Sequence, residues 1–102
     1  MYIYNITFAV EASRLDALLV WIRTYAVPSL SSDGAMSPRL ATVEGNLEET
    51  DMHTVALQFE FVTSADFERW QTSRFEGVMR DYGVAFAPEP LYFATLLRIL
   101  PL

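Results

Sequence analysis

The chain has one histidine, His53, and no cysteine. Imidazole is the only side chain whose ordinary pKa lies near neutrality, so His53 is the first candidate for proton transfer. We expect it near the start of a strand, on the face that carries core residues, where a hydrogen-bonded structural histidine is the commoner outcome. No serine or carboxylate stands at a spacing that marks it as a catalytic partner of His53.

A second candidate is an anion site on the second expected helix. Its apolar side chains recur at helical spacing: Phe67, Trp70, Phe75, Val78 and Tyr82. At 3.6 residues per turn, the centre of this stripe is shared by Gln71 and Arg74. A guanidinium beneath a sheet could hold the carboxylate or phosphate of a small ligand. The structural alternative, which we favour, is an arginine that lies along the core and pairs with Glu60 or Asp81.

Aromatic residues could complete a ligand pocket. Trp70, Trp21 and the tyrosines, Tyr4 among them, are the candidates for its walls. Such residues are more often core or dimer contacts.

Neither a metal nor a cofactor is expected. Glu48, Glu49 and Asp51 precede His53 in a tight acidic turn, but they lack the glycine and carboxylate spacing of a calcium loop. The absence of cysteine excludes thiolate zinc sites, iron–sulfur clusters and disulfides. No phosphate-binding glycine motif or nucleophile-elbow motif is present.

Length and composition predict one globular domain over residues 1–102. The chain is 52% hydrophobic and 20% charged, and its net charge is −6, with seven arginines and no lysine. This charge disfavours nucleic acid and anionic membranes as partners. The N-terminus has no basic lead and apolar core of a signal peptide, and no stretch is long and apolar enough to span a bilayer. We therefore expect a cytoplasmic protein.

Hydrophobic periodicity predicts six elements in the order βαββαβ. Tyr2–Glu11 alternates as a strand, and Ser13 with Asp16 gives a capping signal for a helix that Pro28 ends. A loop is expected from Pro28 to Pro38, and a weaker strand from Arg39 to Leu47.

The second half of the chain repeats this order. Met52–Val62 alternates as a strand. Thr63 with Asp66 caps a second helix that can run to Tyr82, with Gly83 as its stop and a break or bend expected near Gly77. Leu91–Leu100 forms a last strand that is apolar on both faces apart from Thr95 and Arg98.

These elements predict a ferredoxin-like α+β fold, in which a four-stranded antiparallel sheet carries both helices on one face. The second and fourth strands are its edges. The expected core residues are Tyr4, Ile6, Phe8, Val55, Leu57 and Phe59. The opposite sheet face is expected to display Asn5, Thr7, Ala9, Thr54, Ala56 and Gln58.

The fourth strand predicts a partner. An edge strand that is apolar on both faces is an aggregation template if it is left open. We expect another copy of the chain to cover it, in a homodimer.

The opening strand Met1-Tyr2-Ile3-Tyr4-Asn5-Ile6-Thr7-Phe8 resembles that of a family of short bacterial proteins of unknown function. The likeness extends to a Leu- and Trp-rich helix at 18–22, Pro28, and a final strand of the Phe93-Ala94-Thr95-Leu96 kind. The resemblance implies a fold of the dimeric α+β barrel group, which includes cofactor-independent monooxygenases, muconolactone-isomerase-like enzymes and stress-responsive proteins. It implies no catalytic residues for this chain.

These observations predict a homodimeric domain that binds a small molecule or a partner without catalysis of its own. The first alternative is a cofactor-independent monooxygenase- or isomerase-like enzyme, with His53 as proton carrier and Arg74 as anion holder. The second is a purely structural subunit of a larger assembly.

Overall fold

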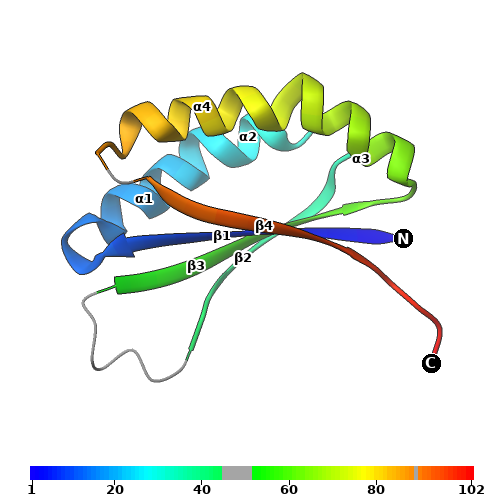
Figure 1. The fold of residues 1–102 in the computed structure, drawn as a ribbon, viewed down its shortest axis with the longest axis horizontal. Helices are drawn as coiled ribbons and strands as arrows, with labels where there is room; N and C mark the ends of the chain where they lie inside the picture. Colours follow the sequence, from blue (N-terminus) through cyan, green and yellow to red (C-terminus); the bar gives the residue numbers. More distant parts are fainter. Residues whose placement is uncertain (45–51, 89) are drawn as a thin grey trace.

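The computed structural model describes residues 1–44, 52–88 and 90–102. One four-stranded antiparallel sheet forms a layer, and the helices lie together on one of its faces (Figure 1). The strands are β1 (Tyr2–Glu11), β2 (Met36–Thr42), β3 (Met52–Phe61) and β4 (Leu91–Arg98). Their order across the sheet is β2-β3-β1-β4, so β2 and β4 are the edges. The predicted ferredoxin-like βαββαβ arrangement is confirmed.

Two helical segments connect the strands, and each contains a wide π-helical turn. What we call the first helix comprises the 3₁₀ turn η1 (Ala12–Arg14), α1 (Leu15–Trp21), the π turn η2 (Ile22–Ala26) and α2 (Val27–Leu30). What we call the second helix comprises α3 (Ser64–Trp70), the π turn η3 (Gln71–Phe75) and α4 (Glu76–Ala85).

The first helix differs from the prediction at both ends. Ser13 makes no capping hydrogen bond, because it lies inside the 3₁₀ turn and helical geometry begins one residue before it. Pro28 does not end the helix, which continues to Leu30. The π turn explains this: the Val27 N–H bonds to the Ile22 carbonyl, five residues back, and this widened turn accommodates a ring that carries no N–H.

The predicted start of the second helix is confirmed, since the Asp66 N–H donates to Thr63 Oγ1 over 3.1 Å. The other two expectations are wrong. The helix stays regular at Gly77, and its irregular turn is η3 instead. Gly83 lies inside α4 without the positive φ that a helix stop needs, and buried Tyr82 and Phe86 keep this last part of the helix packed on the core.

The second strand begins earlier than predicted, at Met36 instead of Arg39. A β-bulge between Met36 and Arg39, with Ser37 at φ 52° and Pro38 lacking an N–H, hides the strand pattern there. The loop before it is correspondingly shorter. The end of the predicted strand at Leu47 and the acidic turn over 48–51 lie outside the described residues.

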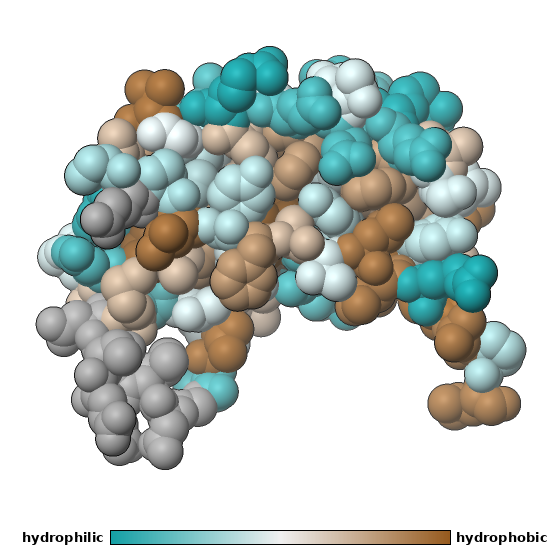
Figure 2. Space-filling view, viewed as in Figure 1, coloured by the Kyte–Doolittle hydropathy of each residue, from teal (hydrophilic) through white to brown (hydrophobic). Residues whose placement is uncertain are grey.

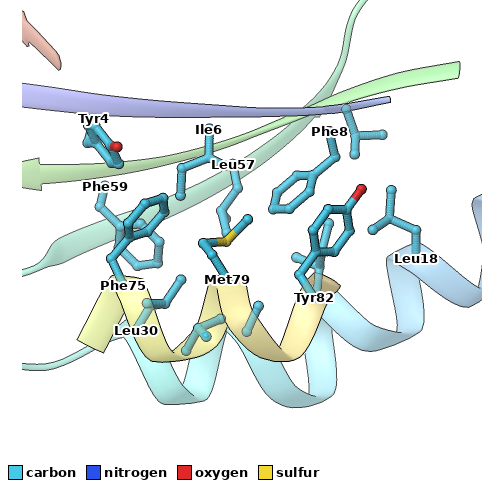
Figure 3. Close-up of a cluster of buried hydrophobic side chains, with 14 of the residues drawn as sticks. Tyr4, Ile6, Phe8, Leu18, Leu30, Leu57, Phe59, Phe75, Met79 and Tyr82 are labelled. Atoms are coloured by element: carbon cyan, nitrogen blue, oxygen red, sulfur yellow. The ribbon is translucent and has the colours of Figure 1, made fainter. Parts of the chain in front are cut away.

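The core lies between the sheet and the two helices (Figure 3). All the predicted core residues are buried, and the register pairs Tyr4 with Phe59, Ile6 with Leu57 and Phe8 with Val55. The Tyr4 ring contacts that of Phe67, with their centroids 4.7 Å apart. Each fully buried side chain of this size contributes about 1.5–3 kcal/mol through removal from water.

The sheet face opposite the helices, which we call the open face, has no covering layer in the described chain. Its central pairs are Asn5–Gln58, Thr7–Ala56 and Ala9–Thr54, so the predicted composition of this face is confirmed. Gln58 Nε2 donates to Asn5 Oδ1 over 3.0 Å, and Asn5 Nδ2 donates to Thr7 Oγ1 over 3.1 Å. These hydrogen bonds pair polar side chains with one another in the middle of the open face.

The apolar part of the outer surface is concentrated along β4 and the residues after it. Within residues 1–44, 52–88 and 90–102, more than half of the exposed large hydrophobic residues belong to this stretch: Leu91, Tyr92, Phe93, Leu96, Leu97, Ile99, Leu100 and Leu102. Phe93 is 67% exposed and points from the open face beside Thr7. Figure 2 shows hydrophobic atoms reaching to the projecting C-terminal end.

Within the described residues, no helix has the length and apolar character that crossing a membrane would require.

The π turn η3 predicts an asymmetry between two deletions. Buried Trp70 and Phe75 are five residues apart, so deleting exposed Thr72 restores an α-helical spacing of four and keeps both rings on the core. Deleting exposed Arg80 from regular α4 turns Tyr82 away from the core by about 100°. By thermal denaturation, we expect the Thr72 deletion to unfold cooperatively and the Arg80 deletion to lose this transition. Equal damage from both deletions would contradict the role of the π turn.

Candidate functional site

The best candidate for a ligand site is a cavity of about 370 Å³ between the first helix and the edge strand β2. Leu19, Arg23 and Val27 line it from the helix, at a spacing of four that puts them on one face. Val55 and Leu57 of β3 form its floor. Five consecutive residues, 38–42, line it from β2, so the cavity runs along the free edge of that strand.

The loop before β2 is tied to the second helix, and this tie positions the edge of the cavity. Asp33 Oδ2 accepts from Ser73 Oγ and from Arg74 Nε, each over 2.9 Å. Gly34 has φ 97°, and a Cβ there would lie 3.1 Å from Asp66 Cβ, so only glycine fits this turn without strain. The chain then enters β2 at Met36.

The charged residues among those that line the cavity are Arg23 and Arg39. Neither forms an ion pair with any residue of the described ranges. The walls beside them are mostly aliphatic, from Leu19, Val27, Leu40 and Leu57. Arg39 pairs with Gln58 of the open face, so its side chain points away from the cavity, and Arg23 supplies the guanidinium on the cavity side. One guanidinium group beside an apolar cavity suits a small apolar molecule that carries an anionic group.

His53 lies near the start of β3, paired with Val10 of β1, and is half-buried. It stands on the helix side of the sheet, as predicted, because it shares a face with Val55. His53 is not among the residues that line the cavity at β2, and Arg74 lies on the second helix. The structure therefore does not bring these two residues together in that cavity, and the catalytic role of His53 stays a prediction.

Arg74 and Gln71 do not share the centre of the buried stripe. The π turn inserts one residue, so Phe75 takes the inward position and Arg74 is exposed. Its ion-pair partner is Asp33, and neither Glu60 nor Asp81, which we expected, has this role. Gln71 is half-buried and borders a different groove, near Tyr92 at the edge formed by β4.

Trp70 and Tyr4 lie in the core. Trp70 is fully buried, and its Nε1–H donates to the Leu30 carbonyl over 2.8 Å, which joins the two helices. Tyr4 packs edge-on against Trp70, with centroids 5.7 Å apart. Burial, with Tyr92 nearby, raises the pKa of the Tyr4 hydroxyl above its ordinary value, so it stays protonated at neutral pH. A ligand contact for either residue stays a prediction.

No three metal-ligating side chains gather among the residues in the described ranges. The acidic segment with Glu48, Glu49 and Asp51 lies outside those ranges.

The sequence analysis missed Arg23 and Arg39. Arg23 carries a weak signal, because it lies four residues after Leu19 and four before Val27 on the border of the apolar stripe. No sequence signal marks Arg39, because the bulge at the start of β2 is not visible in the hydrophobic pattern.

Comparison with known proteins gives the family. The model of a family described as Domain of unknown function (DUF4286) matches residues 1–100. The chain belongs to this family. No curated protein matches it.

The fold of this DUF4286 protein is shared with solved structures to which its sequence identity is low. A dimeric ferredoxin-like protein from an uncultured marine organism is 11% identical, with a TM-score of 0.70 over 99% of this chain and 96% of its own. A monooxygenase from the gene ActVA-Orf6 of Streptomyces coelicolor, solved with nanaomycin D, is 12% identical, with a TM-score of 0.63 over 98% and 91%. A hydroxynitrile lyase from Passiflora edulis is 17% identical, with a TM-score of 0.61 over 98% and 97%. At these identities the likeness establishes the fold alone.

The core position of Trp70 predicts a loss of stability on Trp70→Phe. The change removes one of the two hydrogen bonds to the Leu30 carbonyl, which keeps its bond from the Ser32 N–H. The lost bond costs about 0.5–1.5 kcal/mol of unfolding free energy, and the smaller ring adds to this loss. Chemical denaturation measures the change. Tyr25→Phe is the control, because it removes an exposed hydrogen bond to Asp81. A Trp70→Phe protein as stable as this control would contradict the assignment.

The Asp33–Arg74 pair predicts a pH-dependent stabilisation. The hydrogen bonds from Arg74 and Ser73 lower the pKa of Asp33 below its ordinary value of 3.8. The stabilisation is therefore present above that ordinary value and is lost as the pH falls through the lowered pKa. We expect Asp33→Asn to lower the Tm at neutral pH, and the difference from wild type to shrink in acid. A difference in Tm that does not change with pH would contradict this account.

Proposed function

We propose that this chain is a homodimeric binding domain that holds a small apolar molecule carrying an anionic group in the cavity at β2. The observation that carries this proposal is Arg23 beside the aliphatic walls of the cavity. The chain binds this molecule without catalysis of its own.

The size and chemistry of the cavity support a small ligand. Its volume of about 370 Å³ falls in the lower part of the range, ~300–1,000 Å³, that is typical of ligand pockets. The aliphatic walls favour an apolar body, while an arginine gives an anion a charge-assisted hydrogen bond of about 1.5–3 kcal/mol. The residues that line the cavity carry no carboxylate that would repel the anion.

The exposed apolar residues support the homodimer. Leu91, Phe93 and Leu97 lie on the open face, because the register pairs them with Ala9, Thr7 and Ile3. All three are about half-exposed or more. A second copy that packs on this face would remove them from water. One solved protein of this fold is described as dimeric, which is in line with this proposal.

A cofactor-independent enzyme of the monooxygenase or isomerase kind is the second candidate. The observation in its favour is the fold shared with the Streptomyces coelicolor monooxygenase. Such an enzyme needs a base beside the bound molecule, and His53 is not among the residues that line this cavity. The third candidate, a purely structural subunit, requires no cavity of this size.

Fluorescence titration with 1-anilinonaphthalene-8-sulfonate tests the ligand class, because this dye joins an aromatic body to one sulfonate. We expect Arg23→Gln to weaken binding about tenfold, which corresponds to about 1.4 kcal/mol. Arg39→Gln is expected to bind like the wild type, because the Arg39 side chain lies on the open face. N-phenyl-1-naphthylamine, which has the same rings without the sulfonate, is expected to bind equally to all variants. Arg69→Gln is the control, since Arg69 lies on the exposed side of α3.

Equal dye affinity in the wild type and in the Arg23→Gln variant would contradict the proposal. Equal weakening by Arg69→Gln would also contradict it, because the effect would then follow net charge and not the cavity.

A further inference from the structure

Two features of the chain are each left without a partner. The first is the outer edge of β2, whose backbone pairs only with β3 on its inner side among the described residues. The cavity at Arg23 opens along this edge over residues 38–42. A free strand edge beside an apolar cavity fits an added extended segment, which supplies main-chain hydrogen bonds and places alternate side chains inside.

The second feature is the segment Ile99–Leu102, which we call the C-terminal arm. The Ile99 N–H donates to the Met1 carbonyl over 3.0 Å, which fixes the base of the arm beside β1. Leu100, Pro101 and Leu102 beyond it are exposed. In Figure 1 the chain leaves the sheet here on the side away from the helices. Three large apolar side chains of the arm are thus left in water: Ile99, Leu100 and Leu102.

Within one chain the arm cannot lie along the free edge of β2. The arm starts at the end of β4, and β1 and β3 lie between β4 and β2. Three strand spacings of ~4.8 Å amount to about 14 Å. Four extended residues span about 13–14 Å, so Ile99–Leu102 could at most cross to β2 and could not also lie along it.

We propose that the C-terminal arm of a second copy lies along the free edge of β2 and forms the outer wall of the cavity. This inference rests on the homodimer and the ligand cavity proposed above. A two-fold axis would place the arm of each copy on the β2 edge of the other, because each copy carries one arm and one free edge. Pro101 suits an outermost strand, since it has no N–H to leave unpaired.

With the arm in this position, the ligand site is complete only in the dimer. Its alternate side chains would face the helix side of β2, where Leu40 and Val27 already line the cavity. Apolar side chains from the partner would then close the open side of the cavity and exclude water from the bound molecule. Arg23 would supply the charge, and the partner would supply the apolar cover.

Disulfide trapping tests the arm directly, because the chain has no cysteine of its own. An untagged Leu100→Cys chain is mixed with a tagged Ala41→Cys or Thr42→Cys chain and oxidised at low concentration. Paired strands place Cα atoms ~4.5–5.5 Å apart, within the range of a disulfide. We expect a mixed disulfide as the main product with at least one of the two β2 positions.

The matched control replaces the β2 position by Ala17→Cys, an exposed residue of α1 outside the cavity. A mixed disulfide formed as readily with Ala17→Cys, or none with either β2 position in a protein that is dimeric, would overturn the arm proposal.

Dye binding separates this result from the proposed function. A trapped dimer that binds no 1-anilinonaphthalene-8-sulfonate supports the arm and contradicts the ligand proposal. A protein whose dye binding depends on Arg23, but which yields no mixed disulfide, overturns the arm and supports the ligand cavity.

Discussion

A single layer of helices covers one face of the sheet, and the apolar side chains on the other face and along β4 have no cover within the described chain (Figure 1). Alternate residues of the central strand β1, from Tyr4 to Val10, lie on the covered face and are buried against the two helices. The same alternation sends Leu91, Phe93 and Leu97 of β4 to the open face. Because strand geometry places successive side chains on opposite faces, the chain cannot bury both sets with one layer. This constraint is the basis of the homodimer that we propose.

The two π turns connect the core to the candidate site. In the second helix, η3 moves Phe75 inward and Arg74 outward, where Arg74 holds Asp33 in the loop before β2. In the first helix, η2 carries Arg23 and is followed by Val27, and both line the cavity. The bond from Trp70 to the Leu30 carbonyl links the two helices. The position of β2, and with it the shape of the cavity, thus depends on packing within the helix layer.

Most of the fold could be predicted from the sequence, because strand alternation and helical spacing are local patterns. β1 was predicted to the residue, and the buried faces of β1 and β3 were assigned correctly. The π turns could not be predicted, since they arise where tertiary packing of Trp70 and Phe75 overrides the regular helical spacing. The cavity was missed for a related reason. Arg23 of the first helix and Leu40 of β2 are distant in the sequence. The pairing of β2 with β3, the bulge between Met36 and Arg39 and the tie at Asp33 place them on either side of the cavity.

The most direct test of this account is the mass of the native protein in solution. Sedimentation equilibrium at low micromolar concentration measures it without any variant. The proposed homodimer predicts a particle of twice the chain mass of 11.6 kDa, in which a second copy covers the open face and β4. A stable monomer at that concentration would contradict the account, since the exposed apolar residues of β4 would then be tolerated in water.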